Sequence, residues 1–105
     1  MNYRIIIRPE AEDDLIDEYN WYEEQSRGLG MDFLRCIDIS LNSIQHYPKM
    51  YQKIYKNIHR AFIRRFPYGI FYLIDEEKIV VLAVLHAKRD PKLWKKRISN
   101  YSSAK

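Results

Sequence analysis

The sequence predicts an α+β fold in the order β-α-α-β-β-β, with an antiparallel sheet that carries an αα-hairpin on one face. Three observations support it. A β-branched run opens the chain, two amphipathic helical segments follow, and the second half alternates with the period of strands. A length of 105 residues fits one domain. We expect this domain to fill residues 1–97 and the tail at 98–105 to be frayed.

The first element is a predicted strand from Tyr3 to Arg8, because three isoleucines follow one another there. Pro9 ends the strand and suits the first turn of a helix, and the carboxylates just after it favour the positive end of the helix dipole. This helix is expected to run to about Gln25. The apolar residues that mark its inner face are Ala11, Leu15, Tyr19 and Tyr22.

A turn with two of the three glycines separates the first helix from a second one. The second helix is expected to end near Tyr47, because Pro48 lies just beyond it. Its apolar residues at helical spacing are Phe33, Ile37, Leu41 and Ile44. Two helices joined by so short a turn form an antiparallel hairpin. Residues 48–57 show no clean period and are predicted to be a loop.

Strand periodicity begins at Ile58, and strands are predicted near residues 58–66, 70–75 and 78–86. Short turns join them, so they should form an antiparallel meander. The last strand is nearly all apolar and should be central, with both faces covered. A short basic helix or turn is expected from Pro91 to Arg97. We expect the second face of the sheet and this basic segment to be free for function.

Charge divides the chain into two unlike halves. Residues 1–47 carry 4 basic and 10 acidic side chains, a net of −6, whereas residues 48–105 carry 14 basic and 4 acidic ones, a net of +10. A basic half favours a nucleic acid, a ribosome or an acidic protein segment as partner. The alternative is an ordinary surface that keeps the protein soluble.

Composition excludes several classes of protein. A hydrophobic content of 47% excludes disorder, and a single cysteine excludes a disulfide framework and indicates a reducing compartment. The longest apolar run, Ile79 to Leu85, is too short to span a membrane. The N-terminus has no apolar signal-peptide core. We therefore expect a cytoplasmic protein with no membrane partner.

The chain lacks the motifs GxGxxG, Walker, HExxH and CxxC, so we expect no cofactor, metal or small-molecule substrate. Cys36 is interpreted as a core residue, because no base is recognisable beside it. The three histidines have no known metal spacing. His59 and His86 can still converge on neighbouring strands, and the alternative is that both are half-exposed strand residues.

Two basic segments are candidates for function. Residues 60–68 place arginines on both faces of a predicted strand, which a buried face tolerates only at an edge or groove. Residues 86–97 hold six Lys or Arg, one His and one Trp just after the central strand. The ends of central strands are common positions for functional sites.

Four patterns resemble the RelE/ParE superfamily of bacterial toxins in their order and spacing. They are F-P-Y-G-I-F-Y, V-L-H-A-K-R-D-P, W-K-K-R and the P-E-A-E-D-D-L that opens the first helix. The resemblance covers residues 3 to about 97. It implies the toxin of a type II toxin–antitoxin pair, neutralised by direct binding of a cognate antitoxin. RelE-like members cleave mRNA on the ribosome, and ParE-like members poison DNA gyrase.

The resemblance also assigns residues. It places Arg60 where an RNase would hold one cation, and Lys88 and Arg89 at the basic pair after the last strand. Phe62 stands where a second lysine would be and Gly69 where an arginine would be. Half of the cationic set is therefore absent, and because phosphodiester cleavage needs those charges we favour the ParE-like interpretation.

Three functions remain open on the sequence. The first is a ParE-like gyrase toxin, the second a RelE-like ribosome-dependent mRNA endoribonuclease, and the third a non-toxic basic RNA-binding module. The catalytic residues of an RNase would be Arg60, His86 and Arg89. The target-binding surface is predicted to consist of Arg64, Arg65, Lys88, Trp94, Lys95, Lys96 and Arg97.

Overall fold

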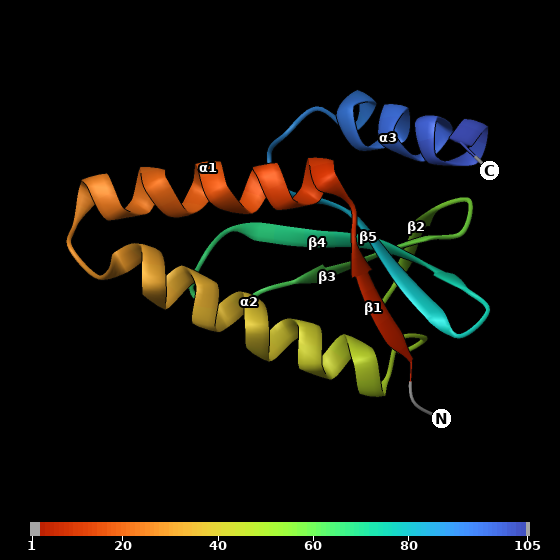
Figure 1. Cartoon of the computed structure of the whole chain (residues 1–105), viewed down its shortest axis with the longest axis horizontal. Helices are drawn as coiled ribbons and strands as arrows, with labels where there is room; N and C mark the ends of the chain where they lie inside the picture. Colours follow the sequence, from red (N-terminus) through yellow and green to blue (C-terminus); the bar gives the residue numbers. More distant parts are fainter. Residues whose placement is uncertain (1–2, 105) are drawn as a thin grey trace.

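A computed structural model describes residues 3–104 and has the expected α+β architecture, with a five-stranded sheet between helical layers (Figure 1). The elements in chain order are β1 (Arg4–Ile7), α1 (Pro9–Gln25), α2 (Leu29–His46), β2 (Lys53–Tyr55), β3 (Ile58–Phe62), β4 (Tyr68–Asp75), β5 (Lys78–His86) and α3 (Pro91–Ala104). None of the helices in the described part of the chain is long and apolar enough to cross a bilayer.

The sheet has the strand order β1-β5-β4-β3-β2. The antiparallel meander and the central position of the last strand are confirmed. One detail differs, because β1 pairs parallel to β5, from Arg4 opposite Lys78 to Ile7 opposite Val81. β2 to β5 alternate in direction, so β1 runs parallel to β5 and β3 and antiparallel to β4 and β2.

The hairpin of α1 and α2 covers one face of the sheet, as predicted. Its core includes Phe33 and Ile44, both fully buried. The two helices approach most closely at Gly30, where an added Cβ would lie 2.7 Å from the Tyr19 carbonyl oxygen. Only glycine allows this approach. Tyr22 and Phe66 also pack in this core, where their rings meet edge-on with 4.9 Å between centroids.

The other face of the sheet was expected to be free, but α3 covers it. Trp94 and Ile98 of α3 are buried against β4 and β5. Figure 1 shows α3 (blue) beyond the end of α1 (red), on the side away from α2. The tail expected to fray from residue 98 is helical to Ala104, and Lys105 lies outside the described residues. The physical reason is apolar spacing, since Trp94, Ile98 and Tyr101 recur at four and three residues.

Two strand boundaries also differ from the sequence prediction. Part of the expected loop at 48–57 forms β2, which turns back onto β3 through Lys56, a residue with φ of 49°. The strand predicted to reach residue 66 ends at Phe62, and Arg65, with φ of 70°, turns the chain toward β4. Left-handed residues without a glycine give no strong signal in a sequence.

A β-bulge in β5 determines which core each residue of this strand faces. Phe71 of β4 pairs with Ala83, and Tyr72 pairs with Val81, so Leu82 is one extra residue in β5. As a result, Leu82 and Ala83 both belong to the α3-side core, and Val84 returns to the hairpin-side core. The bulge therefore lets one apolar strand serve two different cores.

Candidate functional site

The end of β5 brings together three of the predicted site residues. His86 is the last residue of the strand, and its ring meets Tyr68 of β4 edge-on at 5.3 Å between centroids. The His86 Nδ1 atom accepts a hydrogen bond of 3.1 Å from the backbone N–H of Lys88. In the neutral ring the proton therefore lies on Nε2.

Lys88 and Arg89 lie in a turn whose backbone is fixed. The Ala87 N–H donates to the Pro67 carbonyl at 2.7 Å, and the Arg89 N–H donates to the His86 carbonyl at 2.9 Å. Both basic side chains are exposed. The turn thus presents two cations beside His86, while their roles stay a prediction.

Arg60 lies on β3, two strands away from β5, and is half-buried. Its guanidinium carbon is 4.5 Å from the centroid of the Phe62 ring. Its stem crosses Gly69, where an added Cβ would lie 3.0 Å from Arg60 Cγ. The glycine therefore makes the space that the arginine stem occupies. Strand spacing and register put the Arg60 and His86 backbones about 14 Å apart.

Arg64 and Arg65 do not lie on the sheet face, because β3 ends before them. Arg65 Nη2 is 3.8 Å from Asp32 Oδ2 on α2, and both side chains are partly exposed. Such a pair contributes little to stability. Arg64 is exposed. These arginines line the side of the molecule between α2 and β3.

Two residues predicted to bind a target lie inside the fold. Trp94 is only 8% exposed and stacks on Phe71 at 5.4 Å between ring centroids. The Arg97 side chain is only 14% exposed and forms a bidentate ion pair with Asp14 of α1. In contrast, Lys95 and Lys96 are exposed on the same helix, as a binding surface requires. Lys95 Nζ lies 4.7 Å from the centroid of the Tyr55 ring.

The Asp14–Arg97 pair forms hydrogen bonds with backbone groups at the bulge of β5. Asp14 Oδ2 accepts a hydrogen bond of 3.0 Å from the Val84 N–H, and Arg97 Nη1 donates one of 3.2 Å to the Leu82 carbonyl. β1 ends opposite Val81, so these groups lie beyond the last paired residue of that edge. The hydrogen bonds that Arg97 donates to Asp14 raise the pKa of the Arg97 guanidinium. One ion pair therefore joins α1, β5 and α3.

Glu18 belongs to this region and was missed by the sequence analysis. Burial, followed by the charge of Asp14, raises the pKa of its carboxyl from 4.5 to about 9, although Arg89 and Arg97 act in the opposite direction. Its Oε1 atom is buried without a hydrogen-bond partner. Burial likewise raises the pKa of Tyr68, with Tyr22 and Glu18 contributing. A signal was present, since Glu18 has helical spacing with the inward-facing Ala11, Leu15 and Tyr22.

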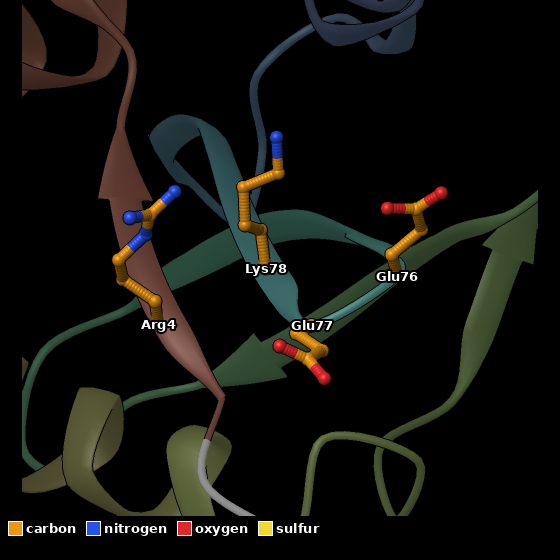
Figure 2. A pocket seen from close by; sticks show the side chains of 4 residues that line it. All are labelled: Arg4, Glu76, Glu77 and Lys78. Carbon is orange, nitrogen blue, oxygen red and sulfur yellow. The ribbon is translucent and has the colours of Figure 1, made fainter.

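A hollow at the opposite end of β5 is lined by Arg4, Glu76, Glu77 and Lys78 (Figure 2). Two acidic and two basic side chains line it, so their charges cancel. Lys78 opens β5 and His86 ends it, so the hollow is separated from the predicted site by the length of the strand. None of the predicted site residues lines it.

The remaining sequence candidates are structural. Cys36 is half-buried against the hairpin-side core, as predicted. His59 is buried, stacks on Tyr72 at 5.1 Å between centroids, and hydrogen-bonds the Tyr51 carbonyl through Nδ1 at 2.8 Å. Through Tyr72 it is level with Val81, five residues before His86, so the two histidines do not converge. Within residues 3–104, no group of three or more His, Cys, Asp or Glu is arranged to hold a metal ion.

Comparison with known proteins identifies relatives that match most of the chain. The family model described as the ParE toxin of the type II toxin–antitoxin system parDE matches residues 5–91. Toxin ParE2 of Mycobacterium tuberculosis strain H37Rv is 24% identical over 100 residues, which cover 94% of this chain and 95% of the relative. The sequence of the same name from strain CDC 1551 matches equally.

Two solved structures share the fold. The chromosomal ParDE toxin–antitoxin system from P. aeruginosa has a TM-score of 0.72 at 12% identity, covering 80% of this chain and 95% of that chain. The RelBE2 toxin–antitoxin complex from Mycobacterium tuberculosis has a TM-score of 0.58 at 17% identity, covering 82% and 99%. At these identities the likeness establishes the fold alone.

Proposed function

Because the chain belongs to the ParE toxin family of type II toxin–antitoxin systems, we propose that it arrests bacterial growth by binding DNA gyrase. A cognate antitoxin neutralises it by direct binding, and both partners meet it in the cytoplasm. The proposal keeps the ParE-like interpretation of the sequence. It rests on membership of the family and on the absence of two expected cations from the sheet face.

The incomplete cationic face is the observation that carries the proposal. Cleavage of a phosphodiester adds charge in the transition state, and losing one stabilising group costs about 100–1000-fold in rate. The resemblance to the superfamily puts Phe62 and Gly69 at two positions where an mRNA-cleaving member would hold cations. The Arg60 stem fills the space over Gly69, and its guanidinium carbon lies 4.5 Å from the centroid of the Phe62 ring, so both positions adjoin the one sheet-face cation that the resemblance already assigns.

The exposed cations suit binding rather than catalysis. Arg97 is neutralised by Asp14, and Trp94 is buried between α3 and the sheet. The exposed members of the predicted target surface are Arg64, Arg65, Lys88, Lys95 and Lys96, joined by Arg89. A protein that inhibits gyrase by contact needs area and complementary charge but no general base.

The antitoxin is inferred from the relatives and from charge. Similar structures include a ParDE toxin–antitoxin system and a RelBE2 toxin–antitoxin complex, and we transfer this kind of partner to the chain. A net charge of +10 on residues 48–105 attracts an acidic segment that folds on binding. The partner is expected to be the product of a small reading frame beside the toxin gene.

Two assays on the purified protein test the target. We expect inhibition of gyrase supercoiling or trapped cleavage complexes, and no ribosome-dependent cuts by primer extension on translated mRNA. Efficient cuts that Arg89→Ala or His86→Ala abolishes, with the fold intact, would overturn the proposal in favour of an mRNA endoribonuclease. RNA binding without growth arrest on expression would instead indicate a non-toxic binding module.

A further inference from the structure

The outer edge of β3 is open beyond Arg60. The Arg60 N–H donates outward to the Gln52 carbonyl at 3.0 Å, whereas the Ile63 N–H donates inward to Tyr68 of β4 at 3.1 Å. Hydrogen bonds alternate along a strand, so the backbone N–H and C=O of Phe62 face outward like those of Arg60. β2 pairs only with Ile58 and His59. Phe62 therefore offers an unpaired strand edge, the kind of edge that binds an added strand.

A groove of about 720 Å³ lies between this edge and α2. Its lining on α2 runs from Asp32 to Ser43, which corresponds to about 16 Å of helix. Asp32 meets Arg65 across one end, and Ser43 hydrogen-bonds the Tyr51 hydroxyl at 2.6 Å across the other. At about 3.3 Å per residue, the groove has room for about five residues of extended chain.

The lining predicts the chemistry of that chain. Ile39 and Phe62 are 66% and 55% exposed, although both are large and apolar. Three arginines and one aspartate also line the groove, so it carries a net positive charge. All three arginines, Arg35, Arg64 and Arg65, are exposed and form a basic rim. A segment that alternates apolar and acidic side chains matches both features.

We propose that an acidic, extended segment of the antitoxin adds to the open edge of β3 and fills the α2–β3 groove. Its backbone bonds Phe62, its apolar residues pack on Ile39 and Phe62, and its carboxylates meet the arginines. The inference rests on the proposed function, since it specifies where the antitoxin of that function binds.

A matched pair of variants isolates the backbone contact. Phe62→Ala removes the ring and keeps the N–H, whereas Phe62→Pro removes both and spares the inward bonds of β3 to β4. With the purified product of the neighbouring reading frame as the probe, Phe62→Pro should bind about 3- to 10-fold more weakly than Phe62→Ala. Equal affinities for two folded variants would overturn strand addition.

Side-chain variants test the groove separately. Ile39→Asp should weaken binding about 10- to 100-fold, because it places a charge at an apolar anchor. Arg64→Glu should slow association in low salt, while Lys92→Glu, the same charge change on the exposed first turn of α3, should leave it nearly unchanged. If both charge variants slow association equally, general attraction and not this groove guides the partner, and the inference fails.

Amide hydrogen exchange on the wild-type complex tests the backbone contact without any substitution. We expect protection of the Phe62 amide on binding, with little change at Ile63, which is already bonded. Tight binding without protection at Phe62 would overturn the inference and leave the proposed function standing. A neighbouring-frame product that neither binds nor relieves growth arrest would overturn both.

Discussion

The two faces of the sheet are covered in different ways. Two helices of 17 and 18 residues cover the hairpin side, whose core contains many fully buried side chains. The other side has one helix of 14 residues, and its anchors are Trp94, Ile98 and the Asp14–Arg97 ion pair. One layer is thus held by distributed apolar burial, and the other by a few specific contacts.

Truncating one large aromatic residue on each side should give the largest changes in stability and show whether the two layers unfold independently. Phe33→Ala should lower the free energy of unfolding by about 3–5 kcal/mol and weaken the whole domain. Trp94→Ala should instead release α3 while the hairpin side stays folded. Urea unfolding with amide exchange distinguishes the outcomes. Loss of protection throughout α1 and α2 in Trp94→Ala would contradict the separation.

The ion pair should be the next most sensitive feature. Arg97→Met leaves the Asp14 carboxylate buried without its partner and should cost about 3 kcal/mol. Adding Asp14→Asn removes that charge, keeps an acceptor for the Val84 N–H, and should restore part of the loss. Unfolding free energies of the two single variants and the double variant check this. Simple additivity would mean that the pair does not join the layers.

Glu18 should make stability depend on pH. Burial raises its folded pKa to about 9, while the unfolded carboxyl ionises near 4.5. Between these values the unfolded chain binds fewer protons, so the free energy of unfolding falls as pH rises. Glu18→Gln should be more stable than wild type by about 1–2 kcal/mol at pH 9, with little difference near pH 4. Urea titrations at three pH values measure this.

The control for that experiment is Glu24→Gln, since Glu24 is on the exposed face of the same helix. It should give a stability curve parallel to that of the wild type. If Glu18→Gln runs parallel as well, the Glu18 carboxyl is ionised in the folded protein.

The smallest effect on folding is expected at the outer side of α3. Lys95→Ala and Lys96→Ala should change the free energy of unfolding by less than about 0.5 kcal/mol, because both side chains are exposed. Gyrase inhibition should weaken in the same variants, measured by supercoiling titration. Full inhibition by the double variant would show that these lysines do not contribute to binding of the target.

The hairpin was predictable because its signals are local. Phe33, Ile37 and Ile44 recur at helical spacing and are all buried. The central strand was predictable for a similar reason, since only a strand covered on both faces is continuously apolar. The sequence resemblance identified Gly69 as a position that lacks the expected cation. Its close contact with the Arg60 stem was not predictable, because that contact depends on the pairing of β3 with β4.

The layer formed by α3 was harder to predict because its lysines and arginines dominate the composition. Trp94 and Ile98 carry a recognisable apolar spacing, yet the basic residues around them suggested a free surface. The role of Arg97 has no local signal at all. Its partner Asp14 is 83 residues away, and the carbonyl of Leu82 is freed by a bulge that periodicity alone does not reveal.

The same 83-residue separation has a consequence for synthesis of the protein. Asp14 leaves the ribosome early, and at about 5–20 residues per second its guanidinium partner is made about 4–17 s later. During that interval α1 can pack on α2, but the carboxylate of Asp14 has no counter-charge at the bulge. Closure of the second layer is therefore a late event, and chains that stop before Arg97 should be preferred substrates for proteolysis.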